Sequence, residues 1–386
     1  MPGQLPAMVS CVVVSSFFAD IHKNNELNNF VLPVVVTEEF LQELFASIEA
    51  DPKMEVEVNL PEQTITNKAT GKSEHFEINA YKKLCLMNGL DDIDFLLSNK
   101  DKNRRMGKEG VKIEIMDTTL RDGEQTSGVS FVPHEKLMIA RLLLEDLKVD
   151  RVEVASARVS DGEFEAVKMI CDWAARRNLL HKVEVLGFVD GHTSVDWIQR
   201  TGCRVINLLC KGSLKHCTQQ LKKTPEEHLA DIINVVHYAD EQDITVNVYL
   251  EDWSNGIKDS PEYVFQLMDG LRETSVKRYM LPDTLGILNP LQVIEYMRKM
   301  KKRYPNTHLD FHAHNDYDLA VSNVLAAVLS GVKGLHTTIN GLGERAGNAP
   351  LASVQAILKD HFNAATNIDE SRLNDVSRVV ESIRVL

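Results

Sequence analysis

Two histidines near the end of a predicted strand are well placed to bind a metal ion. In the segment HLDFHAHND, residues 308–316, polar and apolar residues alternate, so His312 and His314 lie on one face of the strand. Two imidazoles at this spacing can bind one cation. A lone histidine more often packs within a core, but a pair followed directly by Asn315 and Asp316 favours a metal site.

A second group of charged residues follows an earlier predicted strand. The motif DTTLRDGEQTSG places Arg121 next to Asp122, directly after that strand. Asp122 offers a hard oxygen ligand that complements the two histidines, and the Arg121 guanidinium could stabilise an oxyanion. A salt bridge within the turn is the alternative interpretation of this pair.

The same alternation places two glutamates. In ITVNVYLED the apolar residues occupy every second position, so Tyr249 and Glu251 share a face and Glu251 lies near the strand end. In RVEVAS, Glu153 faces inward, and a buried glutamate needs a cationic partner or a proton. For Glu251, a carboxylate that caps the following helix is the alternative.

A glycine-rich loop, NGLGERAGN, joins the last predicted strand to the helix that follows it. Its glycines let backbone amides approach a ligand, although the spacing is not that of a GxGxxG motif. Loops after the last strands of barrels often bind phosphates. Asn348, at the end of the loop, either caps the helix or provides an oxygen near the metal.

These residues together indicate a class of chemistry. They predict a cation held by Asp122, His312 and His314, with Arg121 and Glu251 close to it. Such a site suits a reaction that polarises a carbonyl group and stabilises an enolate.

Bringing these residues together requires a closed barrel of parallel strands. From Val111 onward, strand-like runs alternate with amphipathic segments, and eight such pairs in roughly 250 residues are what a TIM barrel requires. A doubly wound open sheet is the alternative, but it rarely needs eight regular repeats. We therefore predict an α/β protein with a (β/α)8 TIM barrel, preceded by a small β/β/α-type domain fragment. The predicted strands are KIEIMDT, RVEVAS, KVEVLGF, RVINLL, ITVNVYLED, VKRYMLPDT, HLDFHAH and GLHTTIN.

The part of the chain before the barrel has a different pattern. Short apolar runs at residues 11–14, 31–36 and 56–60 accompany one predicted helix, TEEFLQELFASIEA, which Thr37 can cap. A polar stretch at residues 98–110 lacks apolar periodicity and is typical of a linker. The predicted domains are 1–100, a linker at 101–110, the barrel at 111–362 and a further segment at 363–386.

Composition and charge exclude several classes of protein. The chain has 386 residues, and 43 Lys and Arg against 56 Asp and Glu give a formal net charge of −13. Nucleic acids and acidic membranes require a basic surface, so we predict neither as a partner. No run approaches the roughly 18 apolar residues of a membrane span, and no basic region precedes the first apolar run as in a secretory signal. We expect a cytoplasmic enzyme.

Long motifs spread over residues 111 to about 360 resemble one enzyme family. They are DTTLRDGEQTSGVSF, VEVASARVS, NVYLEDWSNG, LPDTLG, FHAHNDYDLAVSN and TINGLGERAGN. The chain resembles the acyl-CoA-dependent Claisen synthases of the DRE-TIM group, which make homocitrate, 2-isopropylmalate and citramalate. The resemblance implies a TIM-barrel acyltransferase of branched-chain amino-acid biosynthesis, leading to leucine or isoleucine. Such an enzyme condenses acetyl-CoA with a 2-oxo acid and then hydrolyses the thioester to release CoA.

The resemblance also implies roles for single residues. Asp122, His312 and His314 match the family's metal ligands, with Asn348 close by, and the ion would be Mg²⁺, Mn²⁺ or Zn²⁺. It would chelate the carbonyl and carboxylate oxygens of the 2-oxo acid.

Other matched positions imply substrate binding and catalysis. Arg121 matches the arginine that binds the keto oxygen, and Thr284 matches the hydroxyl that holds the substrate carboxylate. Glu251 matches a carboxylate that activates the acetyl group or water, and Glu153 matches the acidic residue of the Asp-Arg-Glu signature. The remaining predicted substrate-binding residues are Gln125, Leu186, Leu209, Tyr249 and Asn315.

The implied pocket bears on the choice of substrate. Two leucines and a tyrosine give no cation for the distal carboxylate of 2-oxoglutarate, which disfavours homocitrate synthesis. Bulky leucines also fill space, which favours pyruvate and citramalate over 2-oxoisovalerate and 2-isopropylmalate. This preference is modest, because one methylene is worth about 1–3 kcal/mol in such pockets.

The first hundred residues have a resemblance of their own. The segments SSFFADIHKNNELNNFVLPVVV and EINAYKKLCLMNGLDDIDFLL resemble the small subunit of isopropylmalate dehydratase. That family's Gly-Ser-Ser-Arg-type motif should lie upstream of Cys11, so we expect that residues 1–100 cannot complete a dehydratase site. The resemblance makes the dehydratase large subunit a possible partner, and the synthase family implies a homodimer.

The end of the sequence also departs from the synthase family. Full-length synthases continue into subdomains that supply a histidine and a tyrosine to the site, and nothing after Asn348 matches them. We therefore expect residues 363–386, helical from about Asp369, to begin a truncated subdomain. The alternative function is a catalytically incomplete fusion or fragment that binds metal and oxo acid without turnover.

Overall fold

The structure is a computed structural model that describes residues 11–19, 23, 26–27, 30–100, 112–362 and 364–383. The chain divides into two compact units, Met1–Lys102 and Asn103–Leu386. Within the described residues, no helix is long and apolar enough to cross a membrane.

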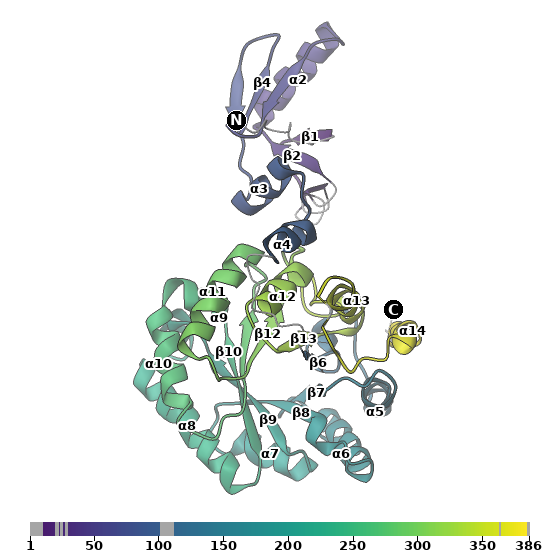
Figure 1. Ribbon diagram of the computed structural model, residues 1–386, viewed down its shortest axis with the longest axis vertical. Helices are drawn as coiled ribbons and strands as arrows, with labels where there is room; N and C mark the ends of the chain where they lie inside the picture. Colours follow the sequence, from purple (N-terminus) through teal and green to yellow (C-terminus); the bar gives the residue numbers. More distant parts are fainter. Residues whose placement is uncertain are drawn as a thin grey trace. The chain divides into compact units, whose positions relative to one another are not determined.

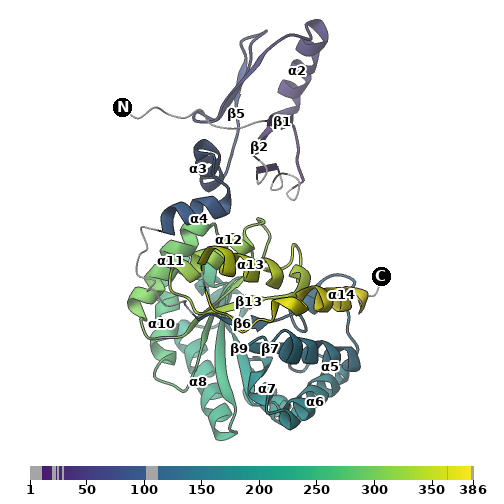
Figure 2. The same cartoon turned by 45° about the vertical axis from the view of Figure 1, so that its right-hand side comes forward.

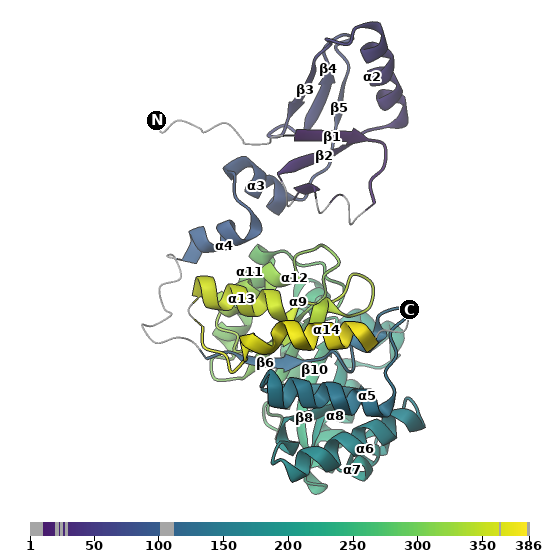
Figure 3. The same ribbon diagram turned by 90° about the vertical axis from the view of Figure 1, so that its right-hand side faces the viewer.

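The first unit combines two small β-sheets with helices (Figure 1). Strands β1 and β2 pair in parallel, whereas β3, β4 and β5 form an antiparallel sheet (Figure 3). Their shared core includes Leu32, Phe40, Ile65 and Phe76. The elements are β1 (Cys11–Ser15), β2 (Val31–Val35), α2 (Glu38–Ala50), β3 (Val56–Asn59), β4 (Thr64–Asn67), β5 (Ser73–His75), α3 (Ala80–Asn88) and α4 (Asp92–Lys100).

Local capping explains where the helices of this unit begin and end. The Thr37 hydroxyl accepts a hydrogen bond from the Phe40 amide at 3.2 Å, which confirms the predicted start of α2. The sequence analysis predicted only this helix and missed α3 and α4. Asn79 caps the start of α3, and Gly89 ends it with a φ of 63°, so both signals were present in the sequence.

The predicted linker begins later than expected. Helix α4 continues through Ser98 to Lys100, so the prediction of irregular structure from residue 98 was wrong at its start. Two acidic residues in its first turn, Asp92 and Asp94, favour a helix there through the helix dipole. The rest of the predicted linker, residues 101–110, lies outside the described residues.

The second unit contains the predicted closed barrel of eight parallel strands. The first strand, β6, pairs with the last, β13, which closes the sheet, and helices surround it (Figure 1). The strands are β6 (Glu114–Asp117), β7 (Arg151–Ser156), β8 (Val183–Phe188), β9 (Val205–Lys211), β10 (Thr245–Glu251), β11 (Tyr279–Asp283), β12 (Leu309–Ala313) and β13 (Gly334–Thr337).

The outer helices follow from capping signals and apolar periodicity. Thr224 and Glu227 form a capping box at the start of α8, and Asn289 and Gln292 form one at the start of α11. The helices are α5 (Pro133–Arg141), α6 (Asp161–Arg176), α7 (Thr193–Thr201), α8 (Pro225–Glu241), α9 (Trp253–Asp259), α10 (Pro261–Leu271), α11 (Pro290–Arg303), α12 (Ala320–Leu329), α13 (Leu351–Phe362) and α14 (Leu373–Ile383).

Helix α14 packs against the barrel. Its residues Val376 and Val380 are fully buried, and it lies near α5 and the loop after β13 (Figures 2 and 3). Ser377 and Asn340 exchange two hydrogen bonds, and Arg372 pairs with Asp146 at 2.8 Å. The segment predicted to be helical from about Asp369 is therefore an outer layer of this unit.

A buried ion-pair network fills the amino-terminal half of the barrel interior. The Arg151 guanidinium on β7 contacts Asp310 on β12 and lies 3.3 Å from both carboxylate oxygens of Glu184 on β8. Because two strands separate β7 from β12 in the sheet, the Arg151–Asp310 contact crosses the interior. Burial alone would raise the pKa of Asp310, but Arg151 holds it well below its usual value.

Removal of the Arg151 charge should destabilise the barrel strongly. We expect Arg151→Met to lower the free energy of unfolding by about 3–5 kcal/mol, because it leaves two buried carboxylates without their cation. Urea denaturation followed by circular dichroism measures the change. Arg272 pairs with Glu273 but is half exposed, so Arg272→Met should cost less than about 1 kcal/mol. Equal effects of the two substitutions would contradict a special role for the buried network.

Candidate metal and oxo-acid site

Three buried side chains meet at the carboxyl-terminal mouth of the barrel. Asp122 follows β6, His312 lies in β12 and His314 follows it. The Asp122 Oδ2 atom lies 3.0 Å from His312 Nε2 and 3.8 Å from His314 Nε2, and the two Nε2 atoms are 3.2 Å apart. One ion with bond lengths of about 2.1 Å can reach all three atoms.

The protonation states of the triad suit a cation. Burial lowers the pKa of His312 and lowers that of His314 to about 4, so both imidazoles are neutral near pH 7. Burial alone would raise the pKa of Asp122, but the Arg121 guanidinium and His312 lower it overall. Asp122 Oδ2 accepts no hydrogen bond from any described residue. One carboxylate oxygen and two imidazole nitrogens therefore converge, and this set of donor atoms fits a divalent metal ion.

Asn348 lies beside this triad. It forms an isolated β-bridge with His314, and its buried Oδ1 has no hydrogen-bond partner among the described residues. The alternative that Asn348 caps the last barrel helix was wrong, because α13 begins at Leu351. The side-chain Nδ2 of Asn348 instead donates to the Leu342 carbonyl. Gly343 permits this arrangement, since a Cβ there would lie 2.3 Å from Asn348 Nδ2.

An arginine joins the loops around the triad. The Arg345 guanidinium, in the glycine-rich loop after β13, bonds to both carboxylate oxygens of Asp316 and to the Thr284 carbonyl at 2.7 Å. These two residues follow β12 and β11, so Arg345 ties three loops together. Arg345 lies in the glycine-rich loop noted in the sequence, but no role was predicted for it.

Arg121 is held by a second set of polar contacts. Its Nε donates to Glu153 Oε2 at 2.5 Å, its guanidinium lies 3.6 Å from Asp122, and its Cζ lies 5.8 Å from the ring centre of Tyr249. Glu153 is fully buried and also accepts a hydrogen bond from Asn207 at 2.7 Å. The predicted cationic partner of Glu153 is thus Arg121, and Glu153 acts through it.

The triad borders a cavity of about 250 Å³. Arg121 and most predicted substrate-binding residues line it, whereas Glu153, Asn315 and Asn348 do not. Four lining residues were not predicted. Phe188 shares the face of Leu186 on β8, whereas Ser156 follows an irregularity in the β7–β8 pairing that alternation does not predict. The lining residues are Arg121, Asp122, Gln125, Ser156, Leu186, Phe188, Leu209, Tyr249, Glu251, Pro282, Thr284, His312, His314 and Glu344.

Asn315 serves the following helix. Its Oδ1 accepts a hydrogen bond from the Ala320 amide at 3.0 Å, and its Nδ2 donates to Asp318 at 3.2 Å. Both polar atoms of the amide therefore stabilise the start of α12, and we leave Asn315 out of the proposed substrate contacts.

Glu251 and Thr284 face the cavity from the ends of β10 and β11. Glu251 pairs with Lys211 on the neighbouring strand β9, and it does not cap α9, which begins after Asp252. Thr284 Oγ1 accepts a hydrogen bond from the Asp252 amide at 2.9 Å, which leaves its hydroxyl hydrogen available to donate. Lys211 was missed, although it shares the inward face of Asn207 and Leu209.

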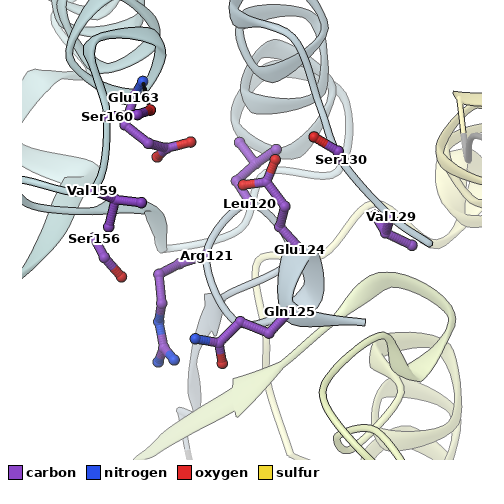
Figure 4. Close-up of a pocket in the computed structure, with 10 residues that line it drawn as sticks. All are labelled: Leu120, Arg121, Glu124, Gln125, Val129, Ser130, Ser156, Val159, Ser160 and Glu163. Carbon is purple, nitrogen blue, oxygen red and sulfur yellow. Dashed lines mark hydrogen bonds between the residues drawn. The ribbon is translucent and has the colours of Figure 1, made fainter. Parts of the chain in front are cut away.

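A second cavity of about 370 Å³ shares part of this lining. Arg121, Gln125 and Ser156 border both cavities, and the second one extends between the loops after β6 and β7 (Figure 4). The buried Lys136 Nζ on α5 lies 2.6 Å from Glu124 and 2.5 Å from Glu163, which joins the loop after β6 to the first turn of α6.

The fold and the site define an α/β barrel with a buried carboxylate and imidazole metal-binding triad. Residues 112–380 match the family described as HMGL-like, and the chain belongs to this family. The predicted resemblance is thereby confirmed. Residues 42–80 match a second family, described as LeuD_N, within the segment predicted to resemble a dehydratase small subunit.

Curated relatives refine this assignment. The (R)-citramalate synthase of Methanocaldococcus jannaschii is 35% identical over 278 residues, which are 72% of this chain and 54% of that protein. The 2-isopropylmalate synthase of Saccharolobus solfataricus is 35% identical over 271 residues, which are 70% of this chain and 68% of that protein. The chain thus spans about half the length of the citramalate synthase and about two thirds of that of the 2-isopropylmalate synthase.

Solved structures share the fold. The hydroxymethylglutaryl-CoA lyase from Pseudomonas aeruginosa superimposes with a TM-score of 0.59 at 18% identity, covering 71% of this chain and 93% of the lyase. At this identity the similarity concerns the barrel alone.

Loss of one triad residue should remove metal binding. We expect His312→Ala to weaken Mn²⁺ binding more than about 100-fold, because even the loss of a group that only hydrogen-bonds to a metal ligand costs about 10–100-fold in affinity. Isothermal titration calorimetry measures the affinity. His308 also points inward from the same part of the chain but pairs with Arg278 at 2.7 Å, so His308→Gln should leave Mn²⁺ binding unchanged. Unchanged affinity in His312→Ala would rule out this metal site.

Proposed function

We propose that this chain carries out the condensation of acetyl-CoA with a 2-oxo acid, followed by thioester hydrolysis, as citramalate and 2-isopropylmalate synthases do. The observation that carries the proposal is the buried Asp122, His312 and His314 triad with Arg121 at one small cavity. The family membership and the 35% identity to synthases of both kinds support the same reaction class.

The metal-binding residues and Arg121 would act on the 2-oxo acid. Asp122, His312 and His314 would hold a divalent ion, with Asn348 beside them, and such an ion supplies Lewis-acid polarisation of the keto group. Arg121 is fixed by Glu153, so its guanidinium can bind the keto oxygen and stabilise negative charge that develops there.

Thr284 would hold the carboxylate of the 2-oxo acid beside the metal-binding residues, because β11 pairs with β12 and Thr284 directly follows β11. The Thr284 oxygen accepts from the Asp252 amide, so its hydrogen can point at a substrate oxygen. A neutral donor of this kind fixes orientation and adds no charge to a site that already holds Arg121 and the cation.

Glu251 is the carboxylate best placed for proton transfer. It lines the cavity and forms an ion pair with Lys211. Removal of one methyl proton from acetyl-CoA yields the nucleophile that forms the new carbon–carbon bond, and the keto oxygen gains a proton. Hydrolysis then replaces the thioester bond by a carboxylate and releases CoA as the thiol. The second cavity gives acetyl-CoA space next to Arg121 and Gln125.

The apolar part of the cavity favours a small substrate. Leu186, Leu209 and Tyr249 pack together with two buried methionines, and Lys211 is already neutralised by Glu251. No free cation among the described lining residues faces this apolar part, so a distal carboxylate would lack a partner. We therefore favour pyruvate over 2-oxoisovalerate, and either over 2-oxoglutarate.

Thiol release tests the proposed reaction directly. The full chain is mixed with acetyl-CoA, Mg²⁺ or Mn²⁺ and each of the three oxo acids, and free CoA is followed with a thiol reagent. We expect pyruvate to give the highest rate and 2-oxoglutarate the lowest. Arg121→Gln should lower kcat about 100-fold or more, as loss of an oxyanion donor does.

The outcomes separate turnover from binding. Thiol release that is equal with and without an oxo acid would refute the condensation. Silence with all three acids, together with metal-dependent oxo-acid binding, would favour the alternative of a chain that binds without turnover. The predicted homodimer and the predicted contact of residues 1–100 with a dehydratase large subunit stay predictions.

A further inference from the structure

The cavity floor contains a tyrosine whose hydroxyl is bonded across the barrel. Tyr249 lies on β10, and its hydroxyl oxygen is 3.1 Å from Nδ1 of His336 on β13. Two strands separate β10 from β13 in the sheet, so the contact crosses the interior. His336 is buried, does not border the cavity and has no role in the proposed reaction.

His336 is itself held in place. Its Nε2 lies 3.2 Å from Asp310 Oδ2, and the same carboxylate contacts the Arg151 guanidinium. A carboxylate only accepts hydrogen bonds, so Nε2 carries the hydrogen. The ring of His336 is therefore fixed on both sides, by Asp310 and by Tyr249.

The apolar neighbours of the Tyr249 ring leave it room to shift, although Arg121 and His312 also lie beside the ring. Met116 and Met280 pack against it together with Leu186 and Leu209. Methionine side chains have several rotatable bonds and fill whatever space is offered. On this apolar side the ring can shift toward the methionines when its hydroxyl is not held, and a shift would change the depth of the apolar part of the cavity.

We propose that His336, anchored by Asp310, is a positioning residue that holds the Tyr249 ring and so limits the size of the oxo-acid side chain that the cavity accepts. The inference rests on the proposed function, because it concerns the 2-oxo acid of that reaction. His336 would thus determine substrate specificity although it does not line the cavity.

Binding of a graded series of oxo acids tests this role without turnover. The full chain loaded with Mn²⁺ is titrated calorimetrically with pyruvate, 2-oxobutyrate and 2-oxoisovalerate in the absence of acetyl-CoA. Tyr249→Phe keeps the ring and removes only the anchored hydroxyl. We expect it to raise the affinity for 2-oxoisovalerate relative to pyruvate by about tenfold, the lower end of what one methylene changes in an apolar pocket.

Changes at His336 should move the same ratio. His336→Leu removes the anchor and should shift the preference in the same direction as Tyr249→Phe. His336→Gln offers a donor to Asp310 and an acceptor to the tyrosine, so it should restore the wild-type order. If His336→Leu does not fold, Tyr249→Phe and His336→Gln still decide the question.

A matched pair elsewhere in the barrel provides the control. His228 Nδ1 lies 2.7 Å from the Tyr263 hydroxyl, and both residues are buried outside the cavity lining. Tyr263→Phe should leave the order of affinities unchanged. A wild-type chain that binds oxo acids, with the same ratio in Tyr249→Phe and His336→Leu, would overturn the role of His336 alone. A wild-type chain that binds none of the acids would overturn the proposed function and, with it, this assignment.

Discussion

Charge pairing inside the closed barrel is the constraint on which the rest of the structure depends. Arg151 lies with Asp310 and Glu184 in one half of the interior, and Arg121 lies with Glu153 and Asp122 near the mouth. A buried charge without a partner is very unfavourable. Loss of either arginine, or of the carboxylates that it pairs with, would therefore leave an unpaired charge in the interior. At the mouth, one guanidinium faces two carboxylates, which leaves negative charge available for a metal cation.

This constraint explains what the sequence could and could not predict. The period of two in each strand predicts which side chains face inward, and the observed interior agrees for Glu153, Tyr249, Asp310 and His312. It does not predict which inward residues lie at the same height, because that depends on the stagger between strands. The Arg151–Asp310 contact joins residues 159 positions apart, and no local pattern indicates it. The His336–Tyr249 hydrogen bond also joins distant strands, so the sequence did not predict it.

Roles are hardest to predict for residues that lie where the chain leaves a strand. Asn315 was assigned from its proximity to the histidines in the sequence, and Asn348 from its place at the end of the glycine-rich loop and from the family resemblance. The Asn315 side chain accepts a hydrogen bond from the first amide of α12, and Asn348 precedes α13 by too many residues to cap it. The alternation of inward and outward side chains holds only while the backbone stays extended. Beyond a strand end, the role of a residue follows from its hydrogen bonds, which the sequence does not show. Glu251, the last residue of β10, kept its predicted orientation because it is still within the strand.

Tyr249 connects the two halves of the interior. Its ring lies near Arg121 and meets the His312 ring edge to face, with 6.2 Å between the ring centres. Its hydroxyl is bonded to His336, which in turn contacts Asp310 and, through that carboxylate, Arg151. The network that stabilises the barrel and the wall that shapes the cavity therefore share one side chain. A substitution deep in the interior can then alter ligand preference without touching the ligand, because it changes how firmly the ring is held. A short chain of hydrogen bonds therefore couples the stability of the barrel to the shape of the cavity.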